Sequence, residues 1–225
     1  MYCGKKCQKE DWNRHKAWHA GMKILLAEAT PAEEAKGITD LEPYGALLKK
    51  GLHACAMGNT SDGAACFQEA IRLCPDQPVA YANIGFMLRD AGDFVAAVPQ
   101  LLKAVELYDE DTEPWAVTSA VAWFAYANPG CESLTVPSWM TVAAERAKMG
   151  ERCALVAPNS MQVWAMLGMS LAEQDEDLSR AAQAMMRAAK LTDLAPTREG
   201  YLKFAKALLQ KMQENGNQSA TSSSK

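Results

Sequence analysis

The sequence contains no apolar run of about 18 residues, the length that a membrane-spanning helix needs. Its N-terminus is basic and contains cysteine, so it lacks the apolar core of a secretory signal peptide. With 225 residues, of which 49% are hydrophobic, the chain is long enough to bury a core. We therefore expect an intracellular protein, in the cytoplasm or, as the alternative, in the nucleus.

Histidine is scarce, and the usual catalytic constellations are missing. The chain has three histidines, and His53 is the only one outside the N-terminal segment. It has no evident cysteine or serine partner with which to form a nucleophilic pair. The sequence also has no glycine-rich phosphate-binding loop. We therefore expect a protein that is not an enzyme, with His53 as a packing or surface residue.

Cysteine is present in an odd number, seven, in a chain without a secretory signal, which argues against a disulfide framework. Free cysteine behaves as a small buried hydrophobe. Five of the seven lie in apolar, helix-like sequence and are expected to be core residues: Cys55, Cys66, Cys74, Cys131 and Cys153. Cys3 and Cys7 stand apart from them, near the start of the chain.

Positive charge is concentrated at the N-terminus. Residues 1–23 hold six basic residues against two acidic ones, a balance of +4. Because the whole chain has a net charge of −4, the remainder carries −8. Most of the chain therefore has no polyanion-binding character. A weak nucleic-acid contact would have to lie in the basic N-terminal segment.

A 34-residue period organises the middle of the chain. Bulky residues share one position of the period and small residues share another, four residues later: Leu47, Tyr81 and Trp115, then Gly51, Gly85 and Ser119. The next such pair, Trp164 and Gly168, lies 49 residues beyond the third, which is one period plus an insertion of 15. Within the last unit, one extra residue in the turn brings the second helix into register. Repeats of this length predict stacked structural units.

Each repeat is predicted to be a pair of helices joined by a short turn. A small residue at the point where two helices cross lets them pack closely, and the bulky residues fill the space to the next unit. Turn signals fall inside the units at Gly58-Asn59, Gly92-Asp93 and the acidic run from Asp175 to Asp177. The pattern favours helical hairpins stacked side by side.

The period and its residues resemble the tetratricopeptide repeat. Its Leu-Gly pair is matched by Ile84-Gly85 and Leu167-Gly168, its Phe by Phe67, its second Ala by Ala70, Ala104 and Ala188, and its Pro by Pro75 and Pro158. The resemblance implies an all-α fold, a right-handed α-α superhelix of about four helical hairpins with a capping helix. It divides the chain into a linker over 29–43, repeats over 44–193 with an insertion near 127–139, a capping helix over 194–214 and a disordered tail over 215–225.

The first helices of such repeats line a concave face, which suits an extended peptide or a partner's helix. In this register the face carries Phe86 and Arg89 from the second unit, Trp123 from the third and Met169 from the fourth. The mixture of small and large apolar residues favours an apolar ligand. The alternative is that Phe86 and Trp123 complete the packing between repeats.

The first 28 residues contain a set of metal-ligating side chains. His15 and His19 are four residues apart on a helix predicted from Asp11 onward, so both imidazoles lie on one face. Cys3 and Cys7 precede that helix, and thiolates and imidazoles are the ligands that zinc prefers. The four residues form a candidate Cys2His2 zinc site, although the seven-residue gap between the pairs is shorter than in the usual finger.

This segment is similar to the second half of a MYND-type zinc finger. The matching residues are Tyr2-Cys3, Cys7-Gln8, Asp11-Trp12 and His15-Lys16, with His19 where the family has a final cysteine. The resemblance implies that Cys3 and Cys7 supply half of one zinc site and His15 and His19 half of another, and that the cysteine pairs of the first half of the finger, which would complete both sites, are missing. Three interpretations stay open: a truncated product or fragment of a longer protein, four ligands regrouped around one ion, or a metal-free segment. MYND fingers bind proline-containing motifs, for which Trp12 and Gln8 are the candidate contacts.

Three functions follow from these interpretations. The leading one is a non-catalytic adaptor that binds a partner protein in the concave face of the repeats. The second, from the MYND resemblance, is a relative of protein lysine methyltransferases that lacks their SET domain. The third is nucleic-acid contact through residues 1–23, for which steep salt dependence is expected.

Overall fold

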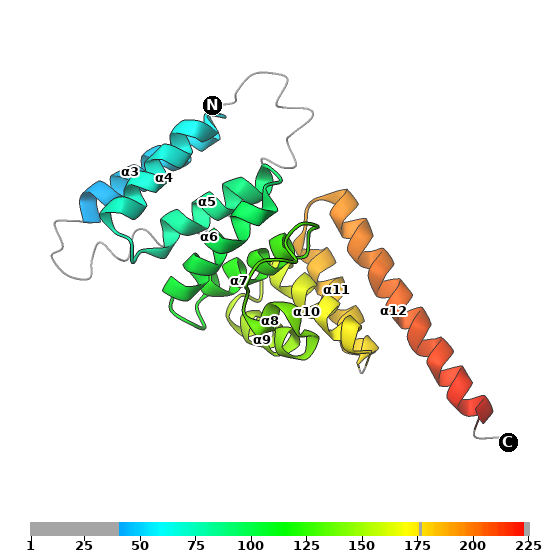
Figure 1. Cartoon of the computed structure of the whole chain (residues 1–225). Coiled ribbons are helices and arrows are strands. Elements are labelled where there is room, and N and C mark those ends of the chain that lie inside the picture. Colours follow the sequence, from blue (N-terminus) through cyan, green and yellow to red (C-terminus); the bar gives the residue numbers. More distant parts are fainter. Residues whose placement is uncertain (1–40, 176, 223–225) are drawn as a thin grey trace. The chain divides into compact units, whose positions relative to one another are not determined.

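The computed structural model describes residues 41–175 and 177–222 of the chain. These residues form helices α3 to α12 and contain no strand, so the predicted all-α fold is confirmed (Figure 1). They divide into two compact units, one ending at Tyr108 and the other beginning at Asp109. No helix among them combines the length and hydrophobicity that a membrane span requires.

The first unit consists of two helical hairpins. Its helices are α3 (Leu41–Ala56), α4 (Thr60–Leu73), α5 (Pro78–Asp90) and α6 (Phe94–Leu107). Helix α3 packs on α4, α5 packs on α6, and α4 connects the two pairs through its contact with α5. The core of the first hairpin, extended by the start of α5, contains six buried side chains: Tyr44, Leu48, Leu52, Phe67, Ala70 and Ala80.

The turns inside these two hairpins have the same structure, 34 residues apart. Gly58 and Gly92 both have a φ of +82°, a left-handed conformation that glycine adopts without strain. The next residue, Asn59 or Asp93, is the N-cap of the second helix, and its side chain accepts a hydrogen bond from the backbone N–H three residues on. The turns predicted at these positions are confirmed.

The second unit contains six helices among its described residues. They are α7 (Glu113–Tyr126), α8 (Ser138–Thr141), α9 (Ala143–Val156), α10 (Met161–Gln174), α11 (Leu178–Leu191) and α12 (Ala195–Ser222). Helix α9 packs on both α7 and α10, and α11 packs on both α10 and α12. Alanine supplies much of the core between α10, α11 and α12, including Ala181, Ala182, Ala188 and Ala205. Small side chains of this kind allow the helices to approach closely.

Glycines mark the closest helix crossings. A Cβ atom added to Gly85 would lie 2.6 Å from Cγ of Leu101, and one added to Gly51 would lie 2.6 Å from Cε1 of Phe67. In the last hairpin, a Cβ on Gly168 would lie 2.7 Å from Sδ of Met185. In each hairpin, the glycine and the residue that its Cβ would meet lie on the two helices. They are 16 positions apart in the first two hairpins and 17 in the last, so the extra residue predicted in the last turn is present.

Three boundaries differ from the sequence prediction. Helix α3 begins at Leu41, inside the predicted 29–43 linker, and the segment between α7 and α9 covers 127–142 and includes α8. Helix α12 continues to Ser222, although residues from 215 onward were expected to be disordered because they have little to bury. A helix anchored by packing extends more easily than it starts, because each added residue forms a backbone hydrogen bond without a new nucleation step.

The described cysteines are free thiols with different degrees of burial. Cys66, Cys131 and Cys153 are buried, as predicted. Cys55 and Cys74 are half-buried and pack against the core of the first hairpin, so the prediction that both are core residues is confirmed only in part. Both lie at the end of a helix, where neighbouring elements cover less of the side chain.

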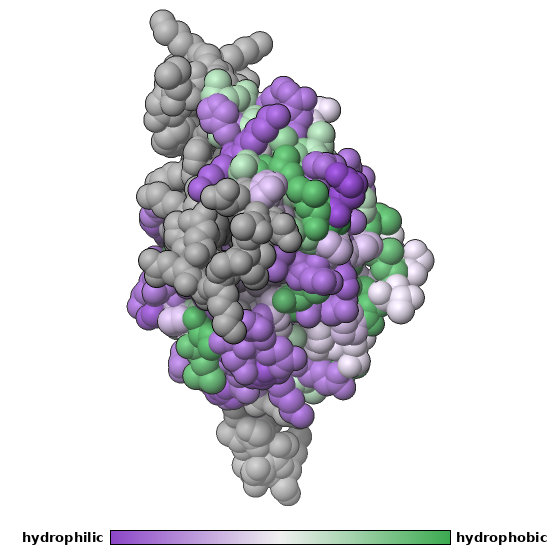
Figure 2. Space-filling view, turned by 90° about the vertical axis from the view of Figure 1, so that its left-hand side faces the viewer, coloured by the Kyte–Doolittle hydropathy of each residue, from purple (hydrophilic) through white to green (hydrophobic). Residues whose placement is uncertain are grey.

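On the face drawn in Figure 2, hydrophobic residues form small patches between hydrophilic ones.

Candidate functional site

Two predicted binding residues lie together on α5. The guanidinium of Arg89 lies over the ring of Phe86, 5.3 Å from its centroid. Arg89 also donates two hydrogen bonds to Oδ1 of Asp90, at 2.9 Å from Nε and 2.7 Å from Nη2. All three side chains are half-buried. They form a small surface with an aromatic ring, a cation and a carboxylate, which we call the α5 patch.

The other two predicted contact residues are in the second unit. Met169 lies on α10, half-buried at the edge of the alanine-rich core. Trp123 lies on α7 and is only 4% exposed, with its ring 4.8 Å from the guanidinium carbon of Arg146. A side chain this deeply buried offers almost no surface to a binding partner. It affects binding mainly by holding neighbouring residues such as Arg146 in position.

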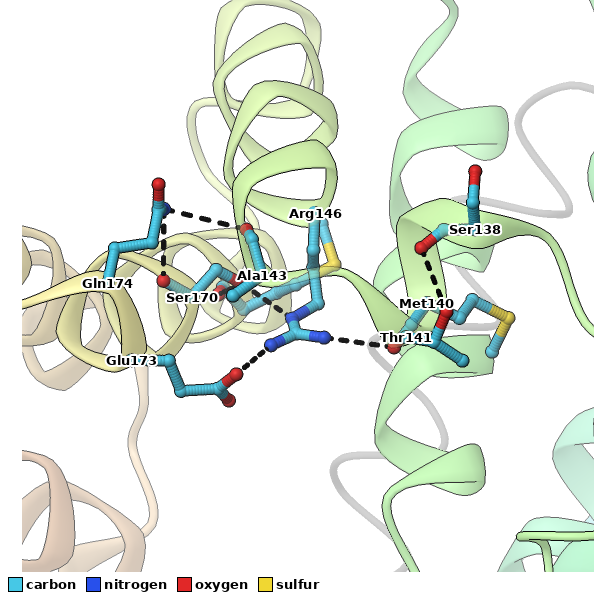
Figure 3. A network of polar contacts seen from close by, with 9 residues as sticks. Ser138, Met140, Thr141, Ala143, Arg146, Ser170, Glu173 and Gln174 are labelled. Atoms are coloured by element: carbon cyan, nitrogen blue, oxygen red, sulfur yellow. Dashed lines mark hydrogen bonds and ion pairs between the residues drawn. The ribbon is translucent and has the colours of Figure 1, made fainter.

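A buried arginine joins four helices of the second unit. Arg146 lies on α9 and is 3% exposed. Its Nε donates to Oγ of Ser170 on α10 at 2.9 Å, and its Nη1 donates to the backbone carbonyl of Met140 on α8 at 2.9 Å. Its Nη2 forms an ion pair with Glu173 on α10 (Figure 3). With the Trp123 ring of α7 beneath it, the guanidinium contacts α7, α8 and α10 at once.

The charge of Arg146 is balanced where the protein meets water. Its partner Glu173 has a side chain that is 51% exposed, so the carboxylate remains hydrated while the guanidinium is buried. Beside this pair, Nε2 of Gln174 lies 3.2 Å from the carbonyl of Ser170 and 3.5 Å from that of Ala143 (Figure 3). A buried cation with a full set of partners stabilises a local structure and does not call for an added ligand. We call these residues the Arg146 network.

A second arginine of α9 fixes the start of the unit. Arg152 donates to Oε2 of Glu110 at 2.9 Å and to the two carboxylate oxygens of Asp111 at 3.1 and 3.0 Å. Its guanidinium also lies over the ring of Trp115, 4.9 Å from the centroid. Hydrogen bonds to Asp111 and then to Glu110 raise the pKa of Arg152 above its ordinary value. The segment that leads into α7 is thereby attached to α9.

Neither arginine could be identified as a site residue from the sequence. Within the helix that contains them, charged residues alternate with alanines, a pattern that predicts a solvated face. The partners of Arg146 come from the insertion and from α10, and the insertion has no counterpart in the other repeats. No signal in the 34-residue period could have identified this pairing.

The predicted zinc ligands and finger contacts lie outside the described residues: Cys3, Cys7, Gln8, Trp12, His15 and His19. Within the described parts of the chain, no three or more His, Cys, Asp or Glu side chains gather as a metal site. His53 is exposed on α3. The structure therefore places no predicted metal ligand.

The chain was compared with protein families, curated proteins and solved structures. No family model and no curated protein matches it. The crystal structure of yeast Tom70 matches 92% of this chain with a TM-score of 0.54 and 20% identity. The fold is tetratricopeptide-like. The chain spans 42% of the Tom70 chain, and at this identity the likeness concerns the fold alone.

Proposed function

We propose that this protein is a non-catalytic adaptor that binds a partner protein through its helical hairpins. The observation that carries the proposal is the tetratricopeptide-like fold, shared with yeast Tom70. Stacked helical hairpins present extended surfaces for binding, and such folds are typically not catalytic. The buried Arg146 of the second unit is consistent with this interpretation. Its contacts hold helices together, so its charge is not available for chemistry on a ligand.

The proposed contacts are the half-buried residues of the first helices. Phe86 and Arg89 on α5 offer apolar surface beside a cation, and Met169 on α10 offers a flexible apolar side chain. Trp123 contributes by supporting Arg146 and the helices around it. The ligand that fits the α5 patch is a peptide or helix of a partner protein, with apolar side chains and an acidic group for Arg89.

The experiment is affinity capture with the full chain as bait, followed by mass spectrometry. Arg89→Glu reverses the charge of the α5 patch, and Arg72→Glu does the same on α4, where the side chain is 70% exposed and pairs with Glu69. A partner captured by the wild type and by Arg72→Glu but lost with Arg89→Glu supports the proposal. Capture of the same proteins by all three chains, or of none by any, contradicts it.

We also propose that the N-terminal segment binds zinc through Cys3, Cys7, His15 and His19, with Trp12 and Gln8 available to a proline-containing partner motif. Two thiols and two imidazoles are a donor set that zinc accepts. Metal content per purified chain tests this, with Cys7→Ser as the variant and Cys74→Ser as the control for loss of a thiol elsewhere. Zinc that is present in the control and absent from Cys7→Ser supports the site. A wild-type chain without zinc after refolding in its presence contradicts it.

A further inference from the structure

The last described side chains of α12 have little to pack against. Ala205 and Leu208 are buried against α11, and Nζ of Lys211 pairs with Oδ1 of Asp175 at 2.9 Å. The side chains of residues 211–215 are all exposed, although the helix continues to Ser222. Because packing supplies most of the stability of a helix, an unpacked end opens at a lower free-energy cost than the packed part.

This end of α12 contains Asn215 followed by Gly216. An asparagine followed by glycine loses its side-chain amide more readily than other asparagines, because no Cβ shields the backbone nitrogen of the glycine. In an α-helix this nitrogen donates to the carbonyl four residues earlier, so the reaction requires the helix to open. Glycine itself weakens a helix. The exposed Asn215 therefore lies where opening is easiest.

A second sequence that can react in this way, Asp62-Gly63, lies on α4 and is held in place. The backbone nitrogen of Gly63 donates to the carbonyl of Asn59 at 3.1 Å, and Nδ2 of Asn59 donates to Oδ2 of Asp62 at 2.5 Å. Gly63 is buried, and a Cβ added to it would lie 2.2 Å from Sγ of Cys55 on α3. Opening α4 there would separate two packed helices. The chain thus contains one such sequence on a packed helix and one on an unpacked end.

We propose that Asn215 is a site of non-enzymatic modification, at which the amide converts to aspartate and isoaspartate. The backbone nitrogen of Gly216 attacks Cγ of Asn215 and forms a C–N bond, which closes a succinimide ring. The side-chain NH2 leaves as ammonia and takes the amide proton of Gly216 with it. Water then opens the ring: attack at Cγ gives aspartate, and attack at the main-chain carbonyl gives isoaspartate. Ammonia is lost and water is gained, without an oxidant or reductant.

The modification shortens α12. Either product places a negative charge beside Glu214, towards the end of the helix where the macrodipole disfavours it. Isoaspartate also adds a carbon to the main chain, which disrupts the spacing of the helical hydrogen bonds. The packed part of the helix, with Ala205 and Leu208, lies before this point and keeps its contacts.

The test follows conversion in the full chain over days in neutral buffer at physiological temperature. Samples are digested with pepsin at acidic pH and analysed by mass spectrometry, and an isoaspartyl methyltransferase quantifies isoaspartate. Conversion at Asn215 is expected in the folded chain. Asp62→Asn places the same Asn-Gly sequence on the packed α4, and position 62 is expected to convert at least about tenfold more slowly than Asn215 in that variant. Gly216→Ala is expected to slow the reaction at Asn215, because a methyl group hinders the attack and alanine favours the helix.

Three results overturn the proposal. The first is an Asn215 that stays intact in the folded chain under conditions that convert it in the urea-unfolded chain. The second is equal conversion at positions 62 and 215 in Asp62→Asn, with circular dichroism showing that this variant is folded. The third is unchanged conversion in Gly216→Ala. Hydrogen exchange in the converted chain is expected to be faster after residue 210 and unchanged over 195–208, and equal exchange in both segments contradicts the shortening of α12.

Discussion

At the scale of single residues, Arg146 has the most consequential contacts in the second unit. A guanidinium has five N–H donors in a planar fork, so it can bond in several directions at once, which an ammonium group cannot do with the same geometry. Here it uses that property to bond Met140 in the insertion and both Ser170 and Glu173 on α10. The insertion is therefore part of the folded unit, held by a defined side chain.

Replacing Arg146 tests this role. Arg146→Ala is expected to lower the free energy of unfolding by about 3 kcal/mol, because the Met140 carbonyl loses its donor and the buried side chain leaves a cavity. Arg146→Lys is expected to give an intermediate loss. Glu173→Gln keeps an acceptor for Arg146 but removes its counter-charge, and is expected to give a smaller loss of about 1–2 kcal/mol, since the Glu173 side chain is half exposed while Arg146 is buried. Urea denaturation measures all three.

The Arg146→Ala variant also shows whether Arg146 holds the insertion in particular or stabilises the whole unit. In Arg146→Ala, hydrogen exchange over residues 127–142 is expected to accelerate more than exchange over α11, because the hydrogen bonds of Arg146 go to α8 and α10. Equal acceleration in both segments would show that the insertion is not held by this arginine.

Two glycines of the first unit provide a matched pair of substitutions. Gly85→Ala places a Cβ 2.6 Å from Cγ of Leu101 and 3.2 Å from its backbone nitrogen, and is expected to destabilise the protein by about 1–3 kcal/mol. A Cβ on Gly45 of α3 has nothing within 4 Å, so Gly45→Ala is expected to stabilise it by about 0.5–1 kcal/mol through helix propensity. Thermal denaturation compares the two. Equal effects would mean that Gly85 is not a close crossing point.

At the scale of the helices, side-chain caps mark the start of the second helices α4, α6 and α11. Asp93 caps α6 through its carboxylate, which accepts the backbone N–H of Ala96 at 3.1 Å. Gln77 occupies the N-cap position of α5 without any side-chain capping bond. Substitutions at Asp93 and Gln77 therefore compare an N-cap residue that makes a side-chain capping bond with one that makes none.

Asp93→Ala is expected to lower the free energy of unfolding by about 1 kcal/mol, because one N–H at the start of α6 loses its acceptor. Gln77→Ala is expected to change it by less than about 0.5 kcal/mol. Guanidinium denaturation followed by circular dichroism measures both. A loss as large at Gln77 as at Asp93 would exclude the capping bond as the cause.

The hairpins could be predicted from the sequence because their signals are local. A glycine in the left-handed conformation followed by Asn59 or Asp93 specifies a turn and a helix start within a few residues. The glycines at the crossings repeat with the period, so Gly51, Gly85 and Gly168 can be aligned from the order of residues alone. The sequence therefore predicts the structure within each hairpin.

The contents of the second unit could not be predicted in the same way. Trp123 falls at a position that the period assigns to the concave face, yet it is covered by Arg146. The covering residue belongs to α9, which follows an insertion of irregular length, so its register is not given by the other repeats. Burial at this position depends on contacts between segments far apart in the chain, which a periodic pattern does not record.

At the scale of the whole molecule, the chain consists of two compact units, each with its own hydrophobic core. In repeat proteins, stability is roughly the sum of the repeats and of the interfaces between neighbours. The second unit contains, among its described helices, the pairings of α9 with α10, α10 with α11 and α11 with α12. Helix α12 covers α11, so the core of this unit is closed at that end by a capping helix.

Residues 109–222 produced alone are therefore expected to be helical by circular dichroism and to unfold cooperatively on heating. A chain over residues 127–222, which lacks α7 and with it the Trp123 ring beneath Arg146, is the comparison and is expected to have a lower melting temperature. A 109–222 chain without a cooperative transition would show that the second unit depends on the first for its folding.

Helix α12 also bears on how the array could be engineered. It begins at Ala195, 34 residues after the start of α10 at Met161, so it has the register of another first helix. At the position equivalent to Gly168 it carries Leu202, which is 38% exposed. At this position in the other hairpins, glycine lets the second helix approach closely. The side chain of Leu202 would keep a second helix added after α12 farther away. A designer who wishes to append a hairpin after α12 should therefore begin with Leu202→Gly, because a single side chain defines this surface as an end.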